Sequence, residues 1–130
     1  MGSGYRIGKG SCLKMLISEV GKIYLASAPV DLRKSYQTLG MHVKQSLGGD
    51  PLSGNWFVFY NKRHDLVKIL FWHTNGFCLW QKRIEKGTFK IPKDLSSVKR
   101  EITTYQLHGL IQGLEWQSRA EKKLHYRLYS

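Results

Sequence analysis

Three short runs rich in aromatic and β-branched residues constrain the fold most strongly. They read NWFVFY at 55–60, LVKILFW at 66–72 and FCLWQKRI at 77–84. Composition and length of this kind are typical of strands. Five residues separate the first two runs and four separate the last two, and the second gap contains Asn75-Gly76, a dipeptide typical of tight hairpins. We therefore predict an antiparallel meander over residues 55–84.

Two further strands are predicted, one on each side of this meander. Residues 22–26 alternate polar and apolar side chains, as a half-buried strand does. Residues Thr88–Ile91 follow a turn at 85–87 and end at Pro92, which cannot continue a sheet ladder. The sheet would then have four or five strands, most of them antiparallel.

Two helices complete the prediction. Asp31 is a plausible N-cap for a long helix that would run to Leu47, because its carboxylate can accept a backbone N–H, and glycines follow at 48–49. A C-terminal helix should begin near Thr103 or Thr104. The predicted fold class is α+β, with the apolar face of the mostly antiparallel sheet packed against both helices and a basic face left open.

The chain has 130 residues, which is enough for one domain. We expect residues 1–19 to be a flexible leader, in part an addition upstream of the natural start, 20–116 to form the single domain, and 117–130 to be a charged tail. No apolar run is long enough to cross a membrane, and no signal peptide is recognisable. We predict a cytoplasmic protein with no membrane partner.

Positive charge is the strongest compositional feature. Lysine and arginine number 21 against nine acidic residues, which gives a formal net charge of +12. Such an excess attracts phosphate backbones, although a solvated sheet face would also explain it. Most of the candidates lie in the meander or just after it, and two lie at the start of the long helix. The candidate nucleic-acid-binding residues are Arg33, Lys34, Lys62, Arg63, Lys68, Lys82, Arg83, Lys86 and Lys90.

Aromatic residues are interleaved with these cations. Most of them are needed for the core, but alternation along a strand leaves two or three exposed, and Trp72 or Trp80 are the candidates. An exposed aromatic ring can stack on an unpaired base, so binding of single strands or RNA is a secondary hypothesis.

Catalysis is weakly supported. The histidines and the two cysteines lack metal-ligand spacing, and the acidic residues are dispersed. Asp65 and Glu85 are expected on neighbouring strand ends and are the best candidates for a nuclease centre. We predict no catalytic residue, no metal ligand and no cofactor.

Six segments, in order, resemble a known family. They are PVDLRK at 29–34, DPLSG at 50–54, FVFYNKR at 57–63, VKILFW at 67–72, NGFCLWQKR at 75–83 and GTFKIP at 87–92. The sequence resembles the TnpB-type accessory proteins, encoded by the second reading frame of bacterial insertion sequences of the insertion-sequence-sixty-six family. Ser35 and His73 depart from the pattern, which tends to have Gly and an acidic residue there.

The resemblance implies an accessory role in transposition, beside a separate transposase that performs the strand chemistry. Within that role, the leading hypothesis is a non-catalytic protein that binds DNA, at the element ends, through the basic sheet face. The alternatives are an adaptor that contacts the transposase without touching DNA and, less favoured, a metal-dependent nuclease. The expected partners are duplex DNA at the element ends, the transposase and other element-encoded proteins.

Overall fold

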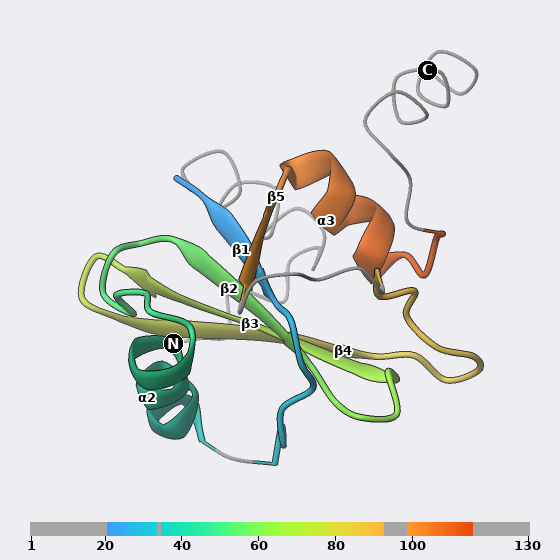
Figure 1. Cartoon of the computed structure of the whole chain (residues 1–130), viewed down its shortest axis with the longest axis horizontal. Helices are drawn as coiled ribbons and strands as arrows, with labels where there is room; N and C mark the ends of the chain where they lie inside the picture. The colour runs from blue at the N-terminus through green and yellow to red at the C-terminus, as the bar shows by residue number, and fades with distance from the viewer. Residues whose placement is uncertain (1–20, 34, 93–98, 116–130) are drawn as a thin grey trace.

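A computed structural model describes residues 21–33, 35–92 and 99–115 of the chain. Within these ranges the protein is α+β, with one five-stranded sheet in the order β4-β3-β2-β1-β5 and two helices (Figure 1). The flexible leader predicted at residues 1–19 and the charged tail predicted at 117–130 lie outside the described residues. No helix in the described part is both long and apolar enough to span a membrane.

The predicted meander is confirmed. Its strands are β2 (Trp56–Tyr60), β3 (Leu66–His73) and β4 (Gly76–Arg83), and both pairings are antiparallel. The β3–β4 hairpin closes at the pair His73↔Gly76, so that Thr74 and Asn75 form the two-residue loop. Thr74 has φ 57°, the left-handed conformation that such hairpin loops require.

The outer part of the sheet differs from the prediction. Strand β1 (Ile23–Ala26) runs parallel to β2, so the sheet is mixed. The fifth strand is β5 (Lys99–Ile102), antiparallel to β1, and not the predicted strand 88–91. Residues 88–91 have no regular secondary structure; Phe89 is buried, and its N–H donates to the carbonyl of His64 at 2.7 Å. Its aromatic side chain therefore anchors a loop.

Helix α2 (Tyr36–Ser46) begins later than predicted. Its N-cap is Ser35, whose hydroxyl accepts from the N–H of Thr38, so the assignment of that role to Asp31 was wrong. The Asp31 carboxylate instead accepts from the backbone N–H of Arg33 and from its guanidinium. The helix ends before Gly48, which has φ 66°.

Helix α3 (Thr104–Ile111) begins where the sequence predicts. Thr103 is the N-cap and forms a capping box with Gln106: the Thr103 hydroxyl accepts from the Gln106 N–H at 3.0 Å, and the Gln106 side chain accepts from the Thr103 N–H at 2.9 Å. Gly113 follows the C-cap with φ 78°, as expected for a residue just past a helix end.

The two helices cover opposite faces of the sheet (Figure 1). One face contacts α2, because the ring of Phe59 on β2 lies against His42 and that of Phe77 on β4 lies against Tyr36. Lys82 projects from the other face, and its Nζ donates to the carbonyl of Ile111 at the end of α3. The prediction of a basic face left open by both helices was therefore wrong.

Candidate nucleic-acid interface

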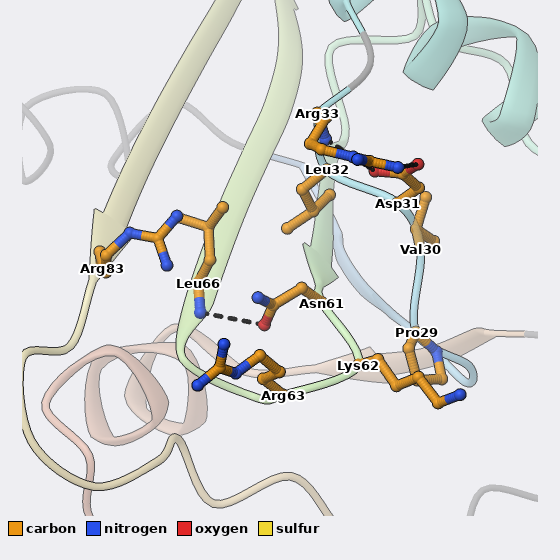
Figure 2. A pocket seen from close by; sticks show the side chains of 10 residues that line it. All are labelled: Pro29, Val30, Asp31, Leu32, Arg33, Asn61, Lys62, Arg63, Leu66 and Arg83. Carbon is orange, nitrogen blue, oxygen red and sulfur yellow. Dashed lines mark hydrogen bonds and ion pairs between the residues drawn. The ribbon is translucent and has the colours of Figure 1, made fainter.

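A cleft opens at one end of the sheet, where β2 turns into β3 and β4 ends. It has a volume of about 640 Å³ and is formed by the loop that precedes α2, the β2–β3 turn and the last residue of β4 (Figure 2). The buried side chains of Leu32 and Leu66 give it an apolar floor. The residues that line it are Pro29, Val30, Asp31, Leu32, Arg33, Asn61, Lys62, Arg63, Leu66 and Arg83.

Four predicted site residues line this cleft. Arg33, Lys62, Arg63 and Arg83 are all exposed and come from three segments that are far apart in the sequence. In Figure 2 the guanidinium groups of Arg63 and Arg83 lie on one side of the cleft, and the Arg33–Asp31 pair lies on the other. Asp31 is the one acidic residue among the described residues of the lining, which together carry a net positive charge.

Asn61 determines the shape of the β2–β3 turn. Its side-chain Oδ1 accepts from the backbone N–H groups of Asp65 (3.0 Å) and Leu66 (3.1 Å), and its Nδ2 donates to the Asp65 carboxylate at 2.6 Å. These bonds hold Lys62 and Arg63 at the tip of a fixed turn, with His64 in the left-handed region at φ 60°. This role of Asn61 was not predicted, although Asn at the start of a turn is a recognisable signal.

Hydrogen bonds with the sheet hold the described residues of the loop before α2. The N–H of Val30 donates to the carbonyl of Tyr60 at 2.9 Å, and the Lys68 Nζ donates to the carbonyl of Leu32 at 2.6 Å. The Arg33 guanidinium forms a two-pronged pair with the Asp31 carboxylate, at 3.0 and 2.9 Å. Hydrogen bonds thus hold the described residues on both sides of the cleft.

Each of the two acidic residues near the cleft forms an ion pair with an arginine of its lining, Asp31 with Arg33 and Asp65 with Arg83. The pKa of Asp65 is lowered, first by the hydrogen bond from Asn61 and then by the charges of Arg83, 3.5 Å away, and Arg63. The hydrogen bond and the charge of Asp31 raise the pKa of Arg33. The side chains of Arg33 and Arg83 are 90% and 55% exposed, so an incoming phosphate can reach them.

The other predicted site residues lie elsewhere. Because side chains alternate along a strand, Lys68 on β3 and Lys82 on β4 project from opposite faces, and their Nζ atoms are bonded to loop and helix carbonyls. Lys86 and Lys90 are exposed on the segment after β4. Lys34 lies outside the described residues. Of the eight candidates that the structure describes, four are thus brought together.

The aromatic and acidic candidates are less well placed. Trp72 and Trp80 are both half-buried, and Trp72 packs edge-on against Phe77 with ring centres 5.2 Å apart. Asp65 is engaged by Asn61 and Arg83, while Glu85 is exposed. The described residues contain no group of three or more potential metal ligands.

A mixed sheet between two helices, with a cation-lined cleft at one end, defines the class of the chain as a small basic α+β protein. The family model described as IS66 Orf2-like protein matches residues 21–121. The chain therefore belongs to the IS66 Orf2-like family, as the sequence resemblance predicted, and is an accessory protein of insertion-sequence transposition.

Two curated proteins of Sinorhizobium fredii (strain NBRC 101917 / NGR234) are similar to this chain. The uncharacterized protein y4hO is 30% identical over 95 residues, which are 73% of this chain and 82% of that protein. The uncharacterized protein y4jC is 31% identical over 102 residues, 78% of this chain and 86% of that protein. No solved structure gives a significant match.

Proposed function

We propose that this accessory protein binds duplex DNA through the phosphates, using the cleft lined by Arg33, Lys62, Arg63 and Arg83, without catalysing a reaction. The observation that carries the proposal is the convergence of these four cations around one concave surface. Its place of action would be the cytoplasm, beside the transposase and the ends of the element.

The chemistry of the cleft suits a phosphate backbone better than a base edge. Arginine can donate two parallel hydrogen bonds to one phosphate, and its delocalised charge needs little desolvation. Lys86 and Lys90 extend the positive surface beyond the cleft, because the hydrogen bond from Phe89 to His64 holds their segment beside the β2–β3 turn. Contacts of this kind position a protein on DNA and carry little sequence information.

Salt-dependent binding tests the proposal. The logarithm of the affinity falls linearly with the logarithm of the salt concentration. Each phosphate contact that is lost should make this fall less steep by roughly one unit of slope. We expect the double variant Arg63→Gln/Arg83→Gln to bind a labelled duplex more weakly than the wild type, with a slope smaller by roughly two units. Fluorescence anisotropy across a salt series measures both quantities.

The matched control removes the same charge elsewhere. Lys22 and Lys44 are exposed and lie outside the cleft, so Lys22→Gln/Lys44→Gln changes the net charge equally. We expect this variant to keep most of the wild-type slope. If both double variants lose affinity and slope equally, only net charge matters and the cleft is not the binding site.

An adaptor function is the second candidate. It is favoured by apolar side chains at the surface: Tyr36 at the start of α2 is 43% exposed and Leu79 on β4 is 39% exposed. In that case the cleft would meet an acidic surface of the transposase. Purified protein that fails to bind any duplex at low salt, yet binds the purified transposase, would favour the adaptor.

A further inference from the structure

We propose that the outer edge of β4 pairs with β4 of a second copy of this chain. The two strands would run antiparallel across a two-fold axis at Leu79 and join two sheets into one of ten strands. The inference does not depend on DNA binding. It begins from the difference between the two edges of the sheet, β4 and β5.

Among the described residues, the β5 edge is protected in the usual way, whereas the β4 edge is not. Strand β5 has four residues and the sequence KREI, so it is short and charged. Strand β4 has eight residues, GFCLWQKR, without proline, and it pairs with β3 in continuous register from Gly76 to Arg83. A long, regular edge with an apolar centre is a template for another strand.

The backbone of β4 leaves alternate residues free to pair outward. In a hairpin with a two-residue loop the closing pair is hydrogen-bonded, so Gly76 and every second residue after it bond to β3. The backbone groups of residues 77, 79, 81 and 83 then point away from the sheet. Within the described ranges, these groups make no further backbone hydrogen bond outside the strand ladder.

The side chains at the centre of this edge are apolar on both faces. Leu79 is exposed and Trp80 is half-buried. Phe77 lies on the same face as Leu79. The centre of its ring is 5.7 Å from the centre of the exposed Tyr36 ring. Pairing with a second copy would cover Leu79 with its own counterpart and bring the two Tyr36 rings toward the axis.

The distribution of charge selects an antiparallel copy. The cations Lys82 and Arg83 lie at one end of β4 only. With the axis at Leu79, Lys82 lies opposite Gly76 and Gln81 lies opposite Phe77 of the other copy, so no like charges face each other. The two Lys82 residues would be about 20 Å apart along the strands, six residues at ~3.4 Å each, which is beyond the Debye length of ~8 Å at physiological salt.

The contact is small for a stable dimer. One strand pair with its flanking side chains buries less than the ~800 Å² per partner of a standard interface. We therefore expect a reversible dimer whose apparent mass rises with protein concentration through the micromolar range. Sedimentation velocity at low and high concentration measures this, and a monomer at every concentration would overturn the proposal.

A cysteine pair tests the register itself. Residues directly opposite in a hydrogen-bonded pair have Cα atoms ~5.5 Å apart, within the range that a disulfide spans. In a Cys12→Ser/Cys78→Ser background, Leu79→Cys should form a covalent dimer rapidly under mild oxidation. The matched control is Gln81→Cys on the same face, whose two copies would be ~14 Å apart and should not crosslink.

Each outcome of the crosslinking decides the proposal. Fast crosslinking at position 79 and slow crosslinking at 81, on non-reducing gels, supports the two-fold axis at Leu79. Equal rates at both positions indicate random collision and contradict it.

A second test places charge at the axis. Leu79→Lys puts two cations face to face there, so the protein should sediment as a monomer at concentrations at which the wild type dimerises. Gln81→Lys should shift the mass distribution much less. If the chain stays monomeric but binds an acidic, strand-forming peptide at β4, the proposed dimer is wrong and the partner of this edge is a different protein.

Discussion

The carboxylate of Asp65 links the turn at the cleft to the stability of the protein. Its pKa is lowered in the folded state, mainly by the hydrogen bond from Asn61 and then by Arg83 and Arg63. A lowered pKa stabilises the fold at pH values above the ordinary value of 3.8, and this contribution is lost as the pH falls through the folded-state pKa.

We therefore expect Asp65→Asn to flatten the acid limb of the stability profile. Between roughly pH 5 and pH 2 the urea midpoint of the wild type should fall more steeply than that of the variant, because only the wild type takes up a proton at this position on unfolding. Urea denaturation at a series of pH values measures it. Parallel acid limbs for the two proteins would contradict the role assigned to Asp65.

We expect Lys68 to act as a positioning residue rather than as a ligand for phosphate. Its Nζ is half-buried and donates to the carbonyl of Leu32 at 2.6 Å, which ties the loop that forms one wall of the cleft to β3. Lys68→Met should lower the free energy of unfolding by about 1–2 kcal/mol, since it leaves that carbonyl without its charged donor.

The salt slope separates these two roles of a lysine. Lys68→Met should weaken DNA binding by disordering the loop while leaving the slope close to that of the wild type, because no phosphate contact is removed. Lys82→Met is the matched control: its hydrogen bond to Ile111 is exposed, and we expect a loss of stability under about 0.5 kcal/mol. A slope lower by a full unit in Lys68→Met would show that Lys68 contacts phosphate itself.

At the scale of the elements, two glycines near helix ends differ in backbone conformation, so that replacing each by alanine should have opposite effects on stability. Gly48 follows α2 with φ 66°, and a Cβ at this position would meet nothing within 4 Å. The cost of Gly48→Ala is therefore conformational alone, about 1–2 kcal/mol for a left-handed alanine. Gly109 lies within α3, without a positive φ and also in open space, so Gly109→Ala should stabilise by about 0.5–1 kcal/mol. Thermal unfolding of the two variants should give shifts of opposite sign.

The elements that the sequence predicts well are those specified by neighbouring residues. The β2–β3–β4 meander follows from local turns, and the start of α3 follows from the capping box at Thr103 and Gln106. The parallel pairing of β1 with β2 joins residues 33 apart, and β5 is a charged strand without alternation, so neither has a local signal. The start of α2 was misplaced because Asp31 and Ser35 are both good caps, and the Asp31 carboxylate is occupied by Arg33.

The same limit applies to the site. Charge alone selects the cations, but their grouping depends on which side of a strand each residue takes and on how distant loops meet. Adjacent residues Lys82 and Arg83 separate onto opposite faces, whereas Arg33 and Arg83, fifty positions apart, line one cleft. An assignment of the cleft from sequence would have required the pairing register and the position of the loop before α2.

At the scale of the whole molecule, the two proposals fix a spacing between binding sites. A two-fold axis at Leu79 and perpendicular to the sheet leaves both clefts on the same side. Arg83 is four residues from the axis, so each cleft lies about 14 Å from the axis along the strands. Each cleft also lies about 7 Å from the axis across the strands, near β3. The clefts would then lie roughly 31 Å apart, close to the ~34 Å turn of B-DNA.

Duplex length should therefore control the affinity of the dimer. A duplex of about eight base pairs, ~27 Å long, reaches one cleft, whereas one of about twenty base pairs reaches both and adds the phosphate contacts of the second cleft. We expect the longer duplex to bind with a salt slope about twice that of the shorter one. Leu79→Lys, a monomer by the argument above, should show one slope for both lengths. A dimer whose slope is independent of length would mean that its clefts do not engage one DNA molecule together, even where each binds phosphate.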